Sequence, residues 1–211
     1  MMTSSVRFQR LDPAWAVRRG CVAMICASAL FGASPPALAQ AQRPDPSQAL
    51  AAQRDALRVL DRMDGLWRGP AWTLLPGGGR HELIQTERVG PLLGGAIKLI
   101  EGRGFEADGS TGFNAFAVLS FDQRQQRYTM QSHAQGQAGT FVVSPTADGF
   151  VWTIPIGADG SIRYTAVIRD GVWFEVGDRL AAGQPPQRIF EMRLKRLGDS
   201  PWPGDGAVPL R

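Results

Sequence analysis

The sequence has few cysteines, few histidines and no long apolar run, and each shortage narrows what the protein can be. Its 211 residues include two cysteines, Cys21 and Cys26, and both lie within the first 39 residues, which carry the features of a signal peptide. The chain that remains after loss of such a leader has no thiol. This excludes a disulfide, a zinc site built on thiolates and a cysteine nucleophile there.

The usual catalytic and nucleotide-binding motifs are absent as well. The chain has no Gly-x-Ser-x-Gly elbow, no His-Glu-x-x-His and no P-loop. Its net charge of +4 comes largely from the leader, which holds four of the 23 basic and one of the 19 acidic residues. The remainder is therefore close to neutral, and we expect no nucleic-acid partner.

Residues 1–39 predict export. Arg18 and Arg19 directly precede an apolar run from Cys21 to Phe31. This run has the length of a signal-peptide core and is too short for a transmembrane helix, which needs about 20 residues. A small-residue stretch then ends in an Ala-x-Ala pattern at Ala39. We expect cleavage there and a periplasmic or secreted protein without a membrane span. The export route stays open.

The rest of the chain divides into a linker, one domain and a tail. Residues 40–47 contain two prolines and predict the linker, residues 48–198 the domain, and residues 199–211 an irregular tail. Ser47 is the expected N-cap of a short amphipathic helix that packs as a lid or plug on the larger body. Its apolar face is Leu50, Leu57, Leu60 and Met63.

From Leu66 onward the apolar period changes from 3.6 to 2, and turn clusters such as Asp108-Gly109 separate the apolar segments. We expect ten strands near residues 66–75, 81–89, 95–105, 112–121, 127–133, 139–144, 149–155, 160–169, 171–180 and 187–197. Short turns join them in order, and closure removes exposed edges. The predicted fold class is all-β, a ten-stranded antiparallel up-and-down barrel with a short N-terminal helix.

Alternation in three strands predicts an apolar interior and a polar exterior. The expected inward residues are Phe113, Ala115, Ala117, Leu119 and Phe121, then Ile162, Tyr164, Ala166 and Ile168, then Phe190, Met192 and Leu194.

The segment Gly65-Leu66-Trp67, just after the helix, resembles the opening of lipocalin and calycin barrels. This resemblance implies that Trp67 plugs the closed end and that an arginine of the last strand, Arg196 or else Arg193, covers its indole. A narrower resemblance is to the DUF1579 family of lipocalin-like uncharacterised proteins, and it implies a calycin-type barrel and no reaction. It rests on Leu66-Trp67-Arg68-Gly69, Glu87, Leu93-Gly94-Gly95, Ser120-Phe121-Asp122 and Tyr128, and it covers most of residues 60–197.

The chain is more distantly similar to nitrobindin-like barrels, which bind haem through a histidine in a late strand. The only histidines here are His81 and His133, and residues 188–196 contain none. We therefore expect no cofactor and no metal, with haem held by His133 as an alternative that stays open.

The candidate ligand site consists of polar residues on faces that can turn inward. Glu101 and Arg103 share a face with Ile97, Leu99 and Phe105, so a carboxylate and a guanidinium lie two residues apart among apolar neighbours. The sequence predicts that Arg103 binds an anionic head and that Glu101 positions it. In the opposite register, Lys98, Ile100 and two glycines would line the interior. The other candidates are Tyr128, His133 and Glu175, joined by Glu87 and Trp152 if the registers agree.

Three functions stay open, and no residue is singled out as catalytic. The first is binding of a hydrophobic or amphipathic small molecule in a cavity that ten strands leave unfilled. The second is a calycin-barrel enzyme, an isomerase or a haem-based detoxifying protein, with convergent polar groups inside. The third is a non-catalytic interaction module of the cell envelope, with a filled barrel and an exposed aromatic patch. The oligomeric state is not predicted.

Overall fold

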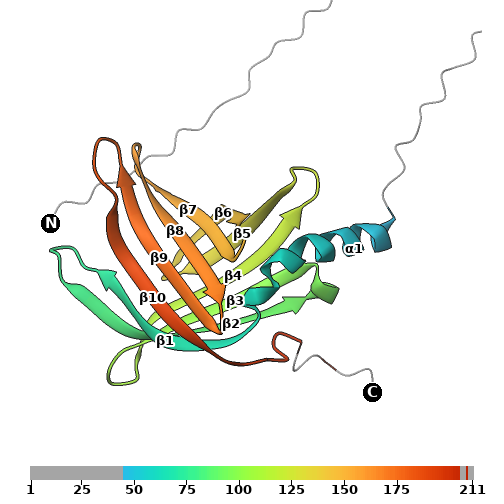
Figure 1. The fold of residues 1–211 in the computed structure, drawn as a ribbon, viewed down its shortest axis with the longest axis horizontal. Helices are drawn as coiled ribbons and strands as arrows, with labels where there is room; N and C mark the ends of the chain where they lie inside the picture. Colours follow the sequence, from blue (N-terminus) through green and yellow to red (C-terminus); the bar gives the residue numbers. More distant parts are fainter. Residues whose placement is uncertain (1–44, 205–207, 209–211) are drawn as a thin grey trace, which may run out of the picture. The chain divides into compact units, whose positions relative to one another are not determined.

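The computed structural model describes residues 45–204 and residue 208, which form a barrel with one helix (Figure 1). The predicted signal peptide and residues 40–44 of the predicted linker lie outside the described residues. Within them, no helix has both the length and the apolar character needed to cross a bilayer.

The elements follow one another in a simple meander. The helix α1 (Pro46–Leu57) continues into the 3-10 segment η1 (Arg58–Met63), and a second 3-10 segment, η2 (Leu93–Gly95), joins the second and third strands. The strands are β1 (Gly65–Leu74), β2 (Arg80–Leu92), β3 (Ile97–Phe105), β4 (Thr111–Asp122), β5 (Arg127–Ala134), β6 (Gln137–Pro145), β7 (Gly149–Ile156), β8 (Gly160–Arg169), β9 (Val172–Ala181) and β10 (Gln187–Gly198).

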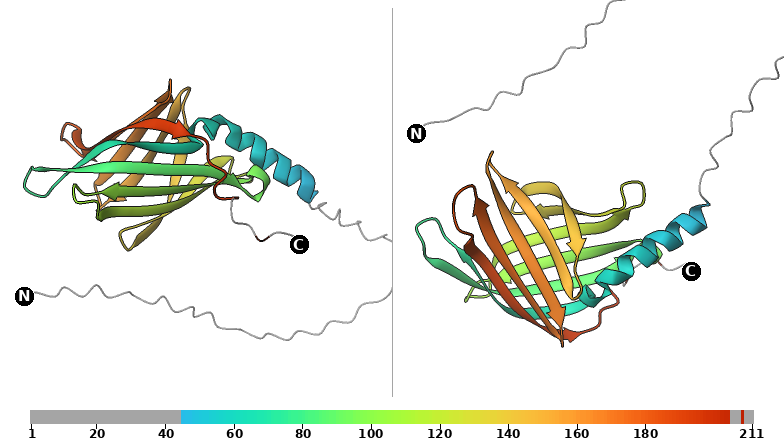
Figure 2. Two further views of the ribbon diagram at one scale, coloured as in Figure 1. Left: turned by 90° about the horizontal axis from the view of Figure 1, so that it is seen from below. Right: turned by 45° about the horizontal axis from the view of Figure 1, so that its top comes forward.

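Each strand pairs antiparallel with its neighbours in the chain, and β1 pairs with β10 to close the barrel (Figures 1 and 2). The predicted all-β fold, a ten-stranded antiparallel up-and-down barrel with a short N-terminal helix, is confirmed. The described residues after β10, 199–204, contain turns and neither helix nor strand.

Gly65 starts β1 at a point where no other residue would fit easily. Its φ of +122° lies in the region that favours glycine, and an added Cβ would lie 2.6 Å from the carbonyl oxygen of Gly198. The small residue lets the first and last strands approach at the seam of the barrel.

The helix begins at Pro46 and is capped by Asp45, so the predicted N-cap, Ser47, is wrong. The Asp45 carboxylate accepts hydrogen bonds from the Ser47 amide at 3.0 Å and from the Ser47 hydroxyl at 2.8 Å. Proline suits the first helical position because its fixed φ is already helical and its missing N–H would have no partner there.

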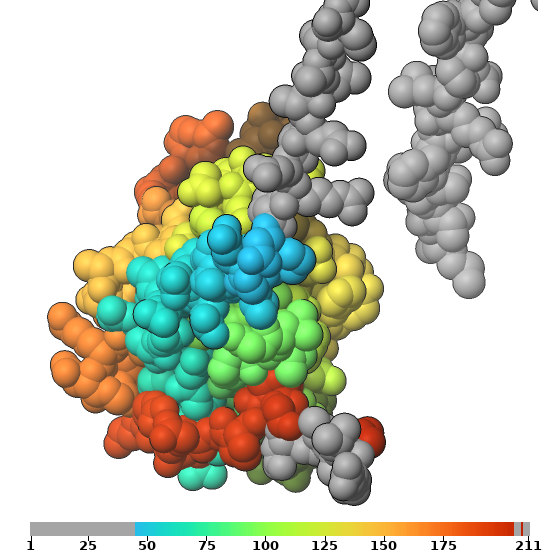
Figure 3. Space-filling view, turned by 90° about the vertical axis from the view of Figure 1, so that its right-hand side faces the viewer, coloured from blue at the N-terminus to red at the C-terminus, as the bar shows by residue number. Residues whose placement is uncertain are grey.

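The end of the barrel next to α1 is closed by the chain that leads into β1. Leu57, Leu60 and Met63 are almost fully buried against the apolar core, whereas Leu50 is exposed. Figure 3 shows α1 in blue lying against the green and yellow-green segments, and α1 contacts β3, η2 and β4. Two side chains of the barrel form hydrogen bonds with the backbone of α1. Tyr128 Oη donates to the Ala56 carbonyl, and Gln123 Nε2 donates to the Ala49 carbonyl.

Trp67 lies in the middle of this closed end. It is 2 % exposed, its indole Nε1 donates to the Met63 carbonyl at 2.8 Å, and it meets Trp173 edge to face at 5.7 Å between ring centroids. The guanidinium carbon of Arg196 lies 5.9 Å from the Trp67 ring centroid, and the same side chain bonds the Asp64 carbonyl and the Asp199 carboxylate.

Lys98 links the segment between α1 and β1, which plugs this end of the barrel, to the barrel wall. Its side chain points inward from β3, is 2 % exposed, and its Nζ lies 2.8 Å from carboxylate oxygens of both Asp61 and Asp64. Burial raises the pKa of Asp64, and the hydrogen bond and charge of Lys98 offset part of that rise. The ammonium is therefore buried with two counter-ions, both supplied by the segment between α1 and β1.

Replacing Trp67 by Ala should lower the free energy of unfolding by about 3–5 kcal/mol, because a large buried aromatic ring and its contacts are lost. The control is Trp72→Ala in the same strand, where the indole is half-buried and the Arg80 guanidinium carbon lies 3.9 Å from its ring centroid. Urea denaturation measures both. Equal losses in the two variants would show that Trp67 does not form the closed end.

Removing both counter-ions of Lys98 should be far more damaging than removing Lys98 itself. Asp61→Asn with Asp64→Asn leaves a buried ammonium without a partner and should cost about 3–5 kcal/mol in urea denaturation. Lys98→Met keeps an apolar stem in the site and leaves two carboxylates that reach water, so it should cost much less. If the lysine variant loses as much as the double variant, the ion pairs do not hold the plug.

Candidate functional site

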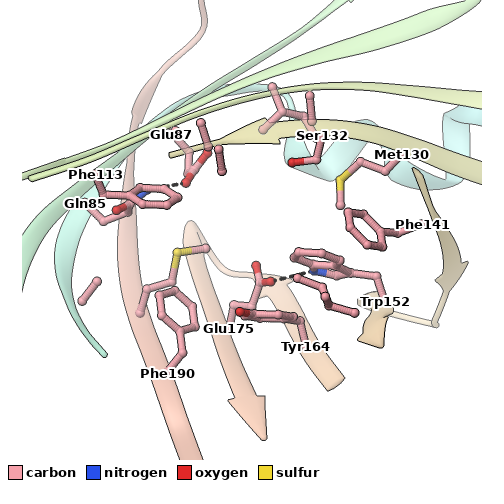
Figure 4. Close-up of a pocket in the computed structure, with 18 of the residues that line it drawn as sticks. Gln85, Glu87, Phe113, Met130, Ser132, Phe141, Trp152, Tyr164, Glu175 and Phe190 are labelled. Carbon is pink, nitrogen blue, oxygen red and sulfur yellow. Dashed lines mark hydrogen bonds between the residues drawn. The ribbon is translucent and has the colours of Figure 1, made fainter. Parts of the chain in front are cut away.

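The barrel encloses a cavity of about 900 Å³. Its walls are mainly apolar, with aromatic side chains from β4, β6, β7, β8 and β10 and a few polar groups between them (Figure 4). The aromatic residues on the wall include Phe113, Phe141, Trp152, Tyr164 and Phe190, and the polar ones include Gln85, Glu87, Ser132 and Glu175. A closed barrel of this size stays hollow only where its inward residues are small, because large inward side chains would fill the space.

Small residues occupy much of one inner wall. Ala115 and Ala117 of β4 line the cavity, as does Gly102 of β3. The predicted inward face of β4 is thus confirmed for the four cavity-lining residues Phe113, Ala115, Ala117 and Leu119. Tyr164, Phe190 and Met192 also line the cavity, in agreement with the faces predicted for β8 and β10.

Glu87 and Gln85 lie against two glycines of the neighbouring strand. In the β2–β3 register Glu87 is opposite Gly102, and Gln85 is opposite Gly104. A Cβ on Gly102 would lie 2.8 Å from Glu87 Oε1, so the absence of a side chain there makes room for the carboxyl group. Gln85 Nε2 donates to Glu87 Oε1 at 2.7 Å, which fixes the carboxyl and leaves Oε2 without a hydrogen bond from the described residues.

Glu175 enters the same cavity from β9 and is held by two indoles. Trp152 Nε1 donates to one of its oxygens and Trp173 Nε1 to the other, both at 3.1 Å. The side chain is 5 % exposed. Both carboxyl oxygens are fixed by neutral donors, and no cation is paired with this group among the described residues.

The two carboxyl groups are shifted toward their neutral form. Burial raises the pKa of Glu87 to about 8, and the nearby charges of Glu175 and Glu101 add to the rise, while the hydrogen bond from Gln85 opposes it. Burial likewise raises the pKa of Glu175 to about 7 against the effect of the two indole hydrogen bonds. Burial and the charge of Glu175 raise the pKa of Tyr164 to about 12, so the phenol stays protonated.

The aromatic side chains beside Glu175 form a continuous wall. Trp152 stacks on Tyr164 with 4.4 Å between centroids and 12° between planes, Phe141 packs against Trp152, and Phe190 against Tyr164. None of the described residues that line the cavity is a lysine or an arginine. His81, which lines it too, bonds the carboxylate of Glu106 at 3.0 Å.

The inward register predicted for Glu101 and Arg103 is wrong. The inner residues of β3 are Lys98, Ile100, Gly102 and Gly104, so Glu101 and Arg103 lie on the outer surface. There Glu101 forms ion pairs with Arg103 and with Arg88 of the neighbouring strand. Its partial burial raises its pKa, but the hydrogen bonds from Arg103 and Arg88 outweigh that effect and lower it. Neither side chain reaches the cavity.

The other predicted residues are scattered. Glu175 lines the cavity, together with Glu87 and Trp152. His133 is exposed on the outer face of β5, since Ser132 and Ala134 on either side of it face inward. Tyr128 lies at the closed end, where its hydroxyl bonds α1 and burial raises its pKa. The residue prediction therefore included both carboxyl groups of the cavity, while its preferred pair, Glu101 and Arg103, lies outside it.

Gln85 and Tyr164 are site residues that the sequence interpretation did not select. The signal for Gln85 was available: Gln85 and Glu87 alternate with outward residues in β2, and Gly102-x-Gly104 in the next strand provides space opposite two long side chains. The alternation of the sequence places Tyr164 on the inner face of its strand but predicts a core residue there, because an aromatic residue at an alternating position usually packs in the core.

The buried acid groups should make stability fall as pH rises. Glu87 has an ordinary pKa of 4.5 and a folded pKa of about 8, so the folded state holds the proton more tightly, and its contribution is lost between those values. Replacing Glu87 by Gln keeps an acceptor for Gln85. The variant should gain stability over wild type as pH rises from 5 to 8, by up to about 1.4 kcal/mol per pH unit.

Urea denaturation at several pH values measures this gain. The matched control is Glu101→Gln on the outer surface, where the lowered pKa predicts no pH-dependent difference from wild type between pH 5 and 8, because Glu101 is ionised in both the folded and the unfolded state over that range. Parallel stability curves for wild type and the Glu87 variant would contradict the raised pKa of Glu87.

Comparison with known proteins finds a solved structure with a similar fold. No family model and no curated protein matches the chain. Among solved structures, the chain is similar to the crystal structure of Rv2717c from M. tuberculosis, with a TM-score of 0.51 and 16% sequence identity, over 67% of this chain and 96% of that one. At this identity the likeness supports the barrel fold alone, and the resemblance to the DUF1579 family stays a prediction.

Proposed function

We propose that the protein binds a hydrophobic or amphipathic small molecule inside its barrel. The observation that carries this proposal is the cavity of about 900 Å³ with mainly apolar walls and a few fixed polar groups. Small-molecule sites in proteins have this character, with volumes of roughly 300–1,000 Å³ and a small number of polar groups that orient the ligand.

The polar groups that would orient the ligand are Gln85, Glu87, Tyr164 and Glu175. The sequence pointed instead to an anionic head bound by Arg103, and the outward position of Arg103 removes the support for that choice. A ligand head that donates hydrogen bonds fits the wall better, because Glu87 Oε2 and the Gln85 carbonyl oxygen accept no hydrogen bond from the described residues.

A calycin-barrel enzyme is the second candidate. It is favoured by two carboxyl groups in one apolar cavity whose pKa values are raised to about 8 and about 7, a range suited to proton transfer near neutral pH. An enzyme would return a chemically altered molecule, whereas a binding protein would return it unchanged. An interaction module was expected to have a filled barrel, and the cavity removes that support.

We also propose, on sequence grounds, that the protein is exported to the periplasm or secreted after cleavage near Ala39, that it belongs with the DUF1579 proteins, and that it needs no cofactor. The outer-face position of His133 removes the support for haem bound by that residue inside the cavity.

The cavity can be tested by filling it. Wild-type protein should bind the neutral fluorescent probe N-phenyl-1-naphthylamine saturably. Ala115→Trp, which projects an indole into the cavity, should weaken binding at least tenfold, about 1.4 kcal/mol. The control is Asn114→Trp, one residue away on the exposed outer face. No saturable binding to wild type, or equal binding to both variants, would contradict the proposed function.

A further inference from the structure

The position of two carboxyl groups, Glu87 and Glu175, inside the cavity is not explained by any gain in the stability of the fold. Glu175 is buried and Glu87 is half-buried, and each is costly in its charged form unless a cation is paired with it. The charged groups that act on Glu87 are themselves acidic, Glu175 on β9 and Glu101 on β3. Glu175 is paired with neutral indoles. The cavity therefore has a surplus of potential negative charge and no lysine or arginine on its described walls to neutralise it, and His81 is already paired with Glu106.

The surroundings of these groups suit one ligand class. Figure 4 shows both carboxyl groups pointing into the same cavity from different walls, with the aromatic wall of Phe141, Trp152, Tyr164 and Phe190 beside Glu175. Aromatic faces attract organic cations, and the attraction grows where water is excluded. Gln85 is 4 % exposed, and its amide nitrogen donates a hydrogen bond to Glu87. Its carbonyl oxygen accepts no hydrogen bond from the described residues. That oxygen is a further acceptor in the same place.

We propose that the cavity takes a lipophilic organic cation, an alkylammonium, whose chain lies on the apolar wall and whose head is bound by Glu87 and Glu175. This proposal rests on the proposed function and specifies its ligand class. The ammonium N–H groups donate to the free Oε2 of Glu87 and to Glu175, and the aromatic wall covers the carbon atoms next to the nitrogen.

Binding of the cation is coupled to proton release. In the empty cavity at neutral pH Glu87 is mainly protonated and Glu175 partly so. The cation favours the carboxylates, so a carboxyl O–H bond breaks, its proton passes to the buffer, and the ammonium replaces it as the positive partner. His81 is paired with Glu106, and the Tyr164 phenol stays protonated, so neither takes up the proton. The affinity for the cation therefore rises as pH increases from about 6 to about 8.

The test uses three probes with the same twelve-carbon chain, which differ only in the head: dodecylammonium, dodecanol and dodecanoate. Each displaces N-phenyl-1-naphthylamine from the full protein. We expect dodecylammonium to bind at least tenfold more tightly than dodecanol, and dodecanoate more weakly than either. Calorimetry in two buffers of different ionisation enthalpy should show release of up to one proton per bound dodecylammonium at pH 7.

Two variants separate recognition from folding. Glu87→Gln should abolish most of the proton release and reduce the preference for dodecylammonium over dodecanol about tenfold. Glu101→Gln, on the outer face of the adjacent strand, should retain both properties. Equal binding of dodecylammonium and dodecanol, or tighter binding of dodecanoate, would overturn the cation proposal and leave the cavity as a binding site. Failure of all three probes and of the naphthylamine would overturn the proposed function itself.

Discussion

Pairing of the first strand with the last is the constraint on which the rest of this protein depends. Once β1 pairs with β10, every strand has two partners and the sheet has an inside that must be filled, plugged or left hollow. At one end the inside is plugged by η1 and by Trp67. In the middle it stays hollow, because the inner faces of β3 and β4 carry glycine and alanine.

The hollow interior changes the chemistry of the groups that face it. A carboxyl group at the barrel surface, such as Glu101, finds two arginines and keeps a lowered pKa. Glu87, on the neighbouring strand but on the inner face, lies against the Gln85 amide and Gly102, and its pKa rises. Which face of the strand a glutamate occupies thus decides whether it forms an ion pair at the surface or is available to a ligand in the cavity. For this reason the proposed binding function and the proposed cation specificity both depend on strand register.

Sequence reasoning predicted the number and position of the strands, because Asp-Gly and related turns divide the chain into segments of clear alternation. It predicted the faces of β4, β8 and β10 for the same reason. It reversed β3, since Ile97, Leu99 and Phe105 lie on the outer face and the inner face carries Gly102 and Gly104, which give no hydropathy signal. Glu87 and Glu175 were among the candidates, but Gln85 and Tyr164 were not selected, because the groups that reach a cavity depend on the space that small residues leave, and that space appears only when the strands are paired.

Native mass spectrometry of the protein purified from its own cells, without added detergent or lipid, tests the central claim most directly. The account predicts a species heavier than the polypeptide by the mass of one small molecule, and that molecule, once released, should be apolar over most of its structure and carry a basic nitrogen. A polypeptide found only at its own mass, with a cavity that a crystal structure of the same sample shows to contain nothing but water, would contradict it.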